Sequence, residues 1–309
     1  MIATKTDRLG AGPVAAYITL CIVWGSTYLA IRLAVQTIPP LLMVGVRSVV
    51  AGGLLTAFAL ARGNRLASVR TLLPLSVASL LLFVGGQAML AVGETRVESG
   101  QAAVIGAMQA LAMPLAAWAL GAGRSPPGVA WLGLLVGFGG VVALMNPGVH
   151  AADPVGLGIV LFSVVAWSFG GAVAARWPAG PVALVSGLQM IIGGLGCLAV
   201  GYGTGGWHGF SVAQVSVRSA EGFFYLIALG SLVGFSAFAW LVQIWPAARL
   251  STYTYVNPVV ALALGAWLGG EVLTMREVLA TGLILGAVAI VMAAGRNAAR
   301  IERERVFDS

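Results

Sequence analysis

Long apolar stretches separated by short polar breaks run through the whole chain. Each has roughly 18 to 24 residues, the length that a helix needs to cross about 30 Å of hydrocarbon, whereas barrel strands would be half as long and would alternate. The pattern predicts ten membrane-spanning helices, over Val14–Gln36, Leu41–Ala61, Leu72–Gly93, Gln101–Leu120, Gly128–Met145, Gly156–Ala175, Pro181–Tyr202, Gly222–Ile244, Leu250–Gly269 and Glu277–Ala294.

Composition agrees with this pattern. The 309 residues are 59% hydrophobic and 9% charged, with a mean hydropathy of +0.97, well above that of soluble domains. Cys21 and Cys197 both fall within predicted spans, where packing roles are expected and neither a disulfide framework nor a metal site is implied. We therefore predict an all-α integral membrane protein without metal or cofactor.

Basic residues indicate the orientation of the chain. With the N-terminus in the cytoplasm, most Arg residues and the single Lys fall on the inner side, and only Arg96, Arg218 and Arg276 fall in outer loops. This bias predicts that both termini are cytoplasmic, and it accounts for the net charge of +7 without nucleic acid. The Ala, Gly and Arg bias is typical of a bacterial protein, so we expect a multi-pass protein of the inner membrane.

Three landmarks recur in the same order in both halves of the chain. Each has a counterpart about 145 residues later: Trp24 and Trp167, Pro114 and Pro258, and the pair Gly133 and Gly137 with Gly282 and Gly286. A second unit of five spans must enter the membrane in the opposite orientation, because five is odd. The sequence thus predicts two inverted five-helix repeats, 1–147 and 148–295, followed by a basic cytoplasmic tail, 296–309.

The recurring glycines are spaced as Gly-x-x-x-Gly, which lets helices approach closely in lipid. One interpretation is a dimer interface; the other, which we favour, is packing of the fifth and tenth spans within a monomer.

Polar side chains within the spans concentrate in the first, third and fourth spans of each repeat. A static bundle does not need them, so this distribution predicts a central cavity between the repeats. Gln101, Gln109 and Met113 share one helix face, as do Tyr253 and Asn257. The predicted substrate-binding residues are Trp24, Tyr28, Gln87, Gln109, Met113, Trp167, Trp240, Tyr253 and Asn257.

Two further pairs have alternative interpretations. Trp24 and Trp167 either belong to the aromatic belt of the membrane interface or line the cavity; their mid-span positions favour the cavity. Pro114 and Pro258 each free a backbone carbonyl, so each predicts a helix kink, either at the substrate site or of the ordinary kind found in membrane helices.

Two arginines lie within spans, where a charge costs on the order of 3 kcal/mol unless it is paired or reaches water. Arg32 is within one turn of the outer end, and we expect it to reach the outer surface. Arg47 lies deeper and is either a similar structural residue or an anchor for a substrate carboxylate.

Titratable chemistry is sparse within the spans. No Asp or Glu is predicted at mid-span, and His150 and His208 fall in outer loops, which weakens a proton relay through a buried carboxylate and argues against an intramembrane enzyme.

Several motifs together point to a known family. The segments "VWGSTYLAIRLA", "ALAMPLAAWALG" and "STYTYVNPVVALALGAWLGGEVLTMREVLATGLILGAVAIVMA" resemble EamA-type members of the drug/metabolite transporter superfamily over nearly the whole chain. The resemblance implies ten helices in an inverted repeat, a central cavity and export by alternating access. Glu271 matches the family's "lgE" motif, but the first half has no equivalent acid, so we assign Glu271 no role in substrate binding.

The sequence thus predicts an exporter of small metabolites, most of all amino acids including aromatic ones, that works in the lipid bilayer and without nucleic acid. Within transport, the alternative is a multidrug exporter, for which an acid in the cavity is expected. From a different class, the alternative is a non-transporting scaffold or sensor, in which the mid-span polar groups would be satisfied within the bundle.

Overall fold

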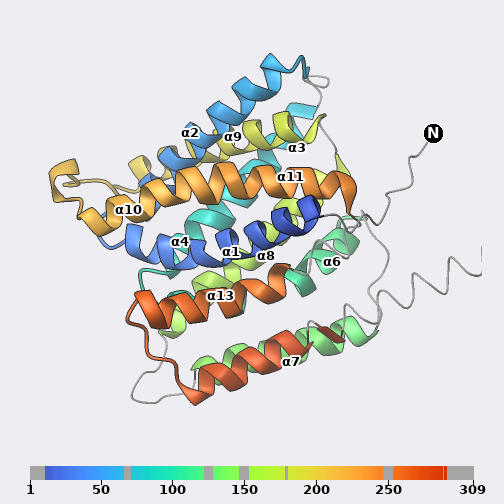
Figure 1. Ribbon diagram of the computed structural model, residues 1–309, viewed down its shortest axis with the longest axis vertical. Helices are drawn as coiled ribbons and strands as arrows, with labels where there is room; N and C mark the ends of the chain where they lie inside the picture. The colour runs from blue at the N-terminus through green and yellow to red at the C-terminus, as the bar shows by residue number, and fades with distance from the viewer. Residues whose placement is uncertain are drawn as a thin grey trace, which may run out of the picture.

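A computed structural model describes residues 11–65, 71–121, 128–145, 153–177, 180–245, 253–287 and 289–290, and these residues form helices and loops without a strand. The tail 296–309 and the boundary between the two predicted repeats lie outside the described residues. The helices are α1 (Ala11–Ala34), α2 (Pro40–Ala61), α3 (Leu72–Leu80), η2 (Leu81–Ala88), α4 (Met89–Gly93), α5 (Ser99–Gly106), α6 (Gln109–Ala119), α7 (Gly128–Met145), α8 (Pro154–Arg176), α9 (Val182–Gly203), η3 (Val212–Gln214), α10 (Val217–Tyr225), η4 (Leu226–Val233), α11 (Gly234–Ile244), α13 (Tyr253–Leu268) and a helix over 275–287 (Figure 1).

Several of these helices have the length and apolarity of membrane spans. Among the described residues, six continuous helices meet both criteria, and α5 with α6, bent by 40°, form a seventh if the pair is one span. The shorter α7, α13 and 275–287 helices coincide with the fifth, ninth and tenth predicted spans. The all-helical membrane fold is therefore confirmed for the described residues, while the count of ten spans stays a prediction.

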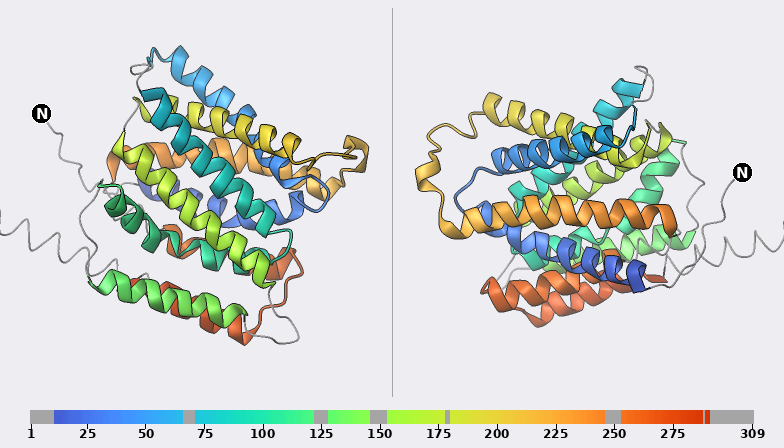
Figure 2. Two further views of the ribbon diagram at one scale, coloured as in Figure 1. Left: turned by 180° about the vertical axis from the view of Figure 1, so that it is seen from behind. Right: turned by 45° about the horizontal axis from the view of Figure 1, so that its top comes forward.

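Helices α2 and α9 lie side by side along one edge of the bundle (Figures 1 and 2). Glycines make their close approach possible: a Cβ atom at Gly52 would lie 2.7 Å from the backbone oxygen of Gly187, and one at Gly194 would lie 2.9 Å from that of Gly45. Close backbone contact of this kind lets membrane helices associate by van der Waals packing.

We expect Gly52→Ala to lower the thermal unfolding midpoint of the protein in detergent, with a cost of about 1–3 kcal/mol, because the new methyl group meets backbone atoms that cannot move aside. The matched control is Gly53→Ala, because a Cβ atom there has nothing within 4 Å. That substitution should leave stability unchanged or raise it by about 0.5–1 kcal/mol, since Ala is the better helix former. Equal loss of stability in both variants would contradict the proposed α2–α9 contact.

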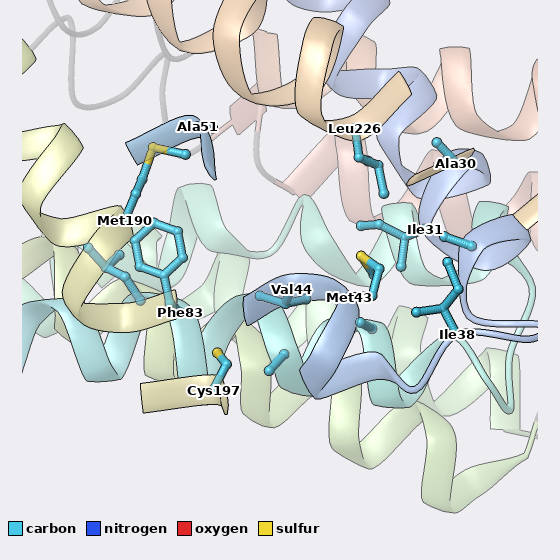
Figure 3. Packing of buried hydrophobic residues seen from close by; sticks show 14 residues of the cluster. Ala30, Ile31, Ile38, Met43, Val44, Ala51, Phe83, Met190, Cys197 and Leu226 are labelled. Carbon is cyan, nitrogen blue, oxygen red and sulfur yellow. The ribbon is translucent and has the colours of Figure 1, made fainter. Parts of the chain in front are cut away.

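A buried apolar cluster joins helices from both halves of the chain. Ile31 of α1, Met43 of α2, Phe83 of η2, Met190 of α9 and Leu226 of η4 belong to it (Figure 3). Its position fixes α1 and α2 against α9 and η4, and therefore sets the wall on which the cavity described below is built.

The fifth and tenth predicted spans pack on each other, but the glycine pair of the tenth span lies outside their contact. Helices α7 and 275–287 lie together at the opposite edge of the bundle (Figures 1 and 2), where a Cβ atom at Gly140 would lie 2.6 Å from Ile284. Positions Gly282 and Gly286, however, face open space. The packing of the two spans is thus intramolecular, but it uses Gly140 and not the second Gly-x-x-x-Gly pair.

One end of the bundle is held together by polar contacts, and we call it the charged end. The Glu271 carboxylate accepts hydrogen bonds from the backbone and hydroxyl of Ser99 and from the backbone of Gly100, at 2.7–3.2 Å, where α5 begins. A helix N-terminus favours an anion, because its first N–H groups have no partner within the helix. Glu277 likewise accepts from Gln101 at 2.8 Å. These contacts tie both the segment before the 275–287 helix, through Glu271, and the first turn of that helix, through Glu277, to α5.

Arg32 belongs to the same end, where its side chain is 32% exposed and also has partners within the protein. Its Nε lies 3.4 Å from a carboxylate oxygen of Glu271, and its Nη1 donates to the backbone oxygens of Glu94, at 3.2 Å, and Val97. Partners within the protein thus offset the cost of the charge. Nearby, Arg96 donates to Asp153 at 2.9 Å, and this hydrogen bond holds the pKa of Asp153, the N-cap of α8, below its ordinary value.

Candidate functional site

A cavity of about 130 Å³ lies between helices from both halves of the chain. Eight of the predicted site residues line it: Trp24, Tyr28, Arg47, Gln87, Gln109, Trp167, Tyr253 and Asn257. They come from α1, α2, η2, α6, α8 and α13. The structure therefore brings together side chains that are more than 230 residues apart in the sequence.

Two predicted site residues lie elsewhere. Met113 is 40% exposed and close to Gly171, and Trp240 is 44% exposed and close to Gly12; neither lines the cavity. Gln109 and Met113 both lie in α6, after the bend that separates it from α5, so periodicity still places them on one face. Met113 is one turn further along α6, however, where it contacts Gly171 of α8 and not the cavity. On α11 it is Phe235, not Trp240, that lines it.

The chain also places lining residues that sequence reasoning missed. Thr27 and Ile31 add to the α1 wall, Leu90 extends the wall formed by Gln87, and Ser163 and Ser231 add hydroxyl groups. Their helical spacing from predicted residues was a usable signal for some of them. Thr27 follows Trp24 by about one turn, as Ile31 follows Tyr28 and Leu90 follows Gln87.

Trp24 is the centre of an aromatic wall. Its ring lies 5.5 Å from that of Phe235, 5.2 Å from Phe238 and 5.1 Å from Tyr253, between ring centroids. Its Nε1 donates to the backbone oxygen of Gly230 at 3.2 Å. Trp24 is therefore a fixed part of the cavity wall, with its one polar atom satisfied.

Within the described residues, the two π-helices lie against the two tryptophans of the cavity. η2 and η4 lie in the third and eighth predicted spans, and glycines there make room for a tryptophan. A Cβ atom at Gly86 would lie 2.9 Å from the Trp167 ring, and one at Gly234, directly after η4, would lie 2.3 Å from Trp24 Nε1. Widened turns of this kind are frequent at functional sites, and no sequence pattern predicted them.

Arg47 is 5% exposed and lines the cavity from α2. One of its Nη atoms donates to the side-chain oxygen of Gln87, whereas its Nε is buried without a hydrogen-bond partner in the part of the chain that the structure describes. Within the same residues, the side-chain oxygen of Asn257, which also lines the cavity, has no partner either. Buried polar atoms without partners cost free energy, so these two mark where a ligand would be stabilised.

The two prolines lie in helices that differ in shape. The chain bends at Ala107 and Met108, about one turn before the carbonyl that Pro114 frees, so the break in this span borders the cavity residues Gly106 and Gln109. Pro258 lies within α13, next to Asn257. Among the described residues there is no group of three or more His, Cys, Asp or Glu side chains that could hold a metal ion.

Thiol labelling can test the cavity. We expect Thr27→Cys to react with a small water-soluble thiol reagent, because Thr27 lines the cavity. The neighbouring Ser26→Cys should stay unlabelled, since Ser26 is buried against the Tyr225 hydroxyl, 2.5 Å away. The native Cys21 and Cys197 are buried and should give little background. Mass spectrometry measures the labelling of each variant. Equal labelling of Thr27→Cys and Ser26→Cys would contradict the position of the cavity.

Comparisons with known proteins agree with this architecture. The sequence profile of the EamA-like transporter family matches residues 12–146 and 154–293. The chain is 36% identical, over 89% of its own length and 89% of the relative's, to a protein of Escherichia coli (strain K12) named uncharacterized inner membrane transporter YedA. It is 26% identical, over 88% of each chain, to the uncharacterized transporter YvbV of Bacillus subtilis (strain 168).

One solved crystal structure of a protein aligns with a TM-score of 0.60 at 19% identity, covering 92% of this chain and 99% of the other. At this identity the likeness shows a shared fold and nothing further.

Proposed function

Since this chain belongs to the EamA-like transporter family, we propose that it exports small metabolites across the bacterial inner membrane, most of all amino acids including aromatic ones. The observation that carries the substrate class is the pair of unpartnered buried atoms in the cavity, a donor on Arg47 and an acceptor on Asn257.

These two atoms complement the two ends of an α-amino acid. The Arg47 guanidinium suits a carboxylate, because it offers planar paired donors, and the hydrogen bond to Gln87 holds it in place. The Asn257 oxygen can accept a hydrogen bond from the ammonium group. Between them, the rings of Trp24, Trp167 and Phe235 provide apolar surface for an aromatic side chain.

The cavity chemistry argues against the alternatives. No lining residue is an Asp or Glu, although an organic cation would be stabilised by one. The unpaired polar atoms argue against a scaffold, in which the bundle would satisfy them.

Transport by alternating access is supported by the symmetry of the contacts. α1 packs on α13 as α8 packs on α6, and these two pairs are equivalent if the halves are inverted repeats. The family profile also matches twice, once in each half. In such folds one repeat rocks against the other around a site near the middle of the membrane.

A proteoliposome screen across labelled amino acids, with and without a pH gradient, tests the proposal. We expect uptake into inside-out vesicles of one or more aromatic amino acids. Transport of none of the amino acids would exclude the amino-acid assignment.

Arg47→Gln should weaken binding of the transported amino acid by about ten- to a hundredfold. Removing one partner of a buried charged pair costs about 1.4–3 kcal/mol of binding free energy, which corresponds to this range. The amino-acid amide, which lacks the carboxylate, should bind the wild type and the variant equally poorly. Arg62→Gln is the matched control, because Arg62 lies exposed at the end of the same helix. An unchanged Kd in Arg47→Gln would show that Arg47 is not the carboxylate anchor.

A further inference from the structure

Glu94 is a buried acid that directly follows the third predicted span. It directly follows α4 and is only 1% exposed. Neither of its carboxylate oxygens has a hydrogen-bond partner among the described residues. An ionised carboxylate without a donor is very costly in such a place, so this arrangement suits the neutral, protonated group.

Glu94 is also adjacent to the proposed substrate site. Gln87 and Leu90, which line the cavity, precede it by seven and four residues, so the three lie along one face of the same span. On α1, Ile31 lines the cavity and the next residue, Arg32, binds the backbone oxygen of Glu94. Glu94 is therefore one turn beyond the cavity, toward the charged end.

Four charged groups act on one another here: Arg32, Arg47, Glu94 and Glu271. Arg32 is already paired with Glu271, whereas among the described residues the hydrogen bond of Arg47 goes to the neutral Gln87. Burial raises the pKa of Glu94 well above its usual range; Glu271 raises it further, and Arg32 and Arg47 lower it. The Tyr28 hydroxyl of α1 also interacts with Glu94. From the third neighbouring element, α8, the charged group at this end is Asp153 at its N-cap, which is paired with Arg96.

The charge of this group decides what Arg47 can bind. When Glu94 is protonated, the four residues together carry one net positive charge, which a substrate carboxylate at Arg47 neutralises. When Glu94 is ionised, the group is already neutral, and the Arg47 Nε and the Glu94 carboxylate, both without partners, would satisfy each other. A substrate carboxylate must then compete with Glu94 for the same guanidinium.

We propose that Glu94 is a proton-binding positioning residue: its protonation frees Arg47 for the substrate carboxylate, and its ionisation withdraws Arg47 from the cavity. Binding of a carboxylate substrate and binding of a proton are therefore cooperative. The inference rests on the proposed function, because it needs a substrate that Arg47 anchors. It goes further by assigning a proton site and a sign to the pH dependence of binding.

Binding of labelled L-phenylalanine to the purified protein, measured from about pH 5.5 to 8.5, tests the proposal. The wild-type Kd should be constant below the pKa of Glu94 and rise up to about tenfold per pH unit above it, because only the protonated form binds well. In Glu94→Gln the residue stays neutral, so the Kd should stay low and independent of pH. Glu94→Leu, a second neutral variant, should behave the same way.

Glu221→Gln is the matched control, because Glu221 is an exposed acid on α10. It should keep the pH dependence of the wild type. A wild-type Kd that does not change with pH, or a pH dependence that persists in both Glu94 variants, would overturn the proposal while leaving the proposed function intact.

A second measurement needs no substrate. Because Glu94 is held protonated in the folded state and ionises at lower pH in the unfolded state, wild-type stability should fall as the pH rises from about 4.3 toward the folded-state pKa. The thermal unfolding midpoint of Glu94→Gln should lack this part of the decline, whereas that of Glu221→Gln should keep it. Parallel curves for the wild type and Glu94→Gln would show that Glu94 does not carry the proton. If phenylalanine binds at no pH but the stability curves differ, the proton site stands and the substrate class of the proposed function fails.

Discussion

Two tryptophans determine the shape of the cavity, because each ring rests on a helix from the other half of the chain. Trp24 of α1 fits against Gly234 and donates to the Gly230 carbonyl, and Trp167 of α8 fits against Gly86. The large rings stand where the facing helices have glycine and a widened π-turn. The space between the halves is thus set by rigid aromatic side chains, and the smaller polar side chains line what remains.

The structure separates polar groups that hold the bundle together from those available to a ligand. At the charged end, Glu271 and Gln101 have partners on other segments, so their polar atoms are satisfied within the protein. In the cavity, Arg47 and Asn257 keep atoms without partners. A buried polar atom without a partner costs free energy, and where such an atom also lines a cavity, as in Arg47 and Asn257, a ligand can supply the missing hydrogen bond.

Hydrophobic pattern and repeat landmarks were sufficient to predict the all-helical membrane fold and eight of the residues that line the cavity. Trp24, Trp167 and Asn257 were found because a polar or aromatic residue at mid-span is costly without a purpose. Met113 and Trp240 lie outside the lining because helical periodicity gives the face of a helix and not how far along that face the cavity extends: Met113 is one turn beyond Gln109, and on α11 it is Phe235 that lines the cavity. Single-residue patterns also do not reveal whether a helix is α or π, so the glycine seats of the tryptophans became visible only in three dimensions.

Glu94 shows why position in the sequence is a weak guide to burial. It lies at the end of an apolar span, where an acid is ordinarily hydrated, and yet it is only 1% exposed. The helix that it follows, α4, packs on α2 and α8, and Arg32 of α1 binds its backbone oxygen. The neighbouring contacts close the charged end: Arg32 with Glu271, and Glu271 with the start of α5.

Opening the charged end would require these contacts to separate, and water would then reach Glu94. Because α1 carries both Arg32 and the cavity residues Tyr28 and Ile31, one helix movement would change the hydration of the carboxyl group and the shape of the cavity together. Under the proposed function, access to the site and ionisation of its neighbouring acid would therefore be coupled through α1.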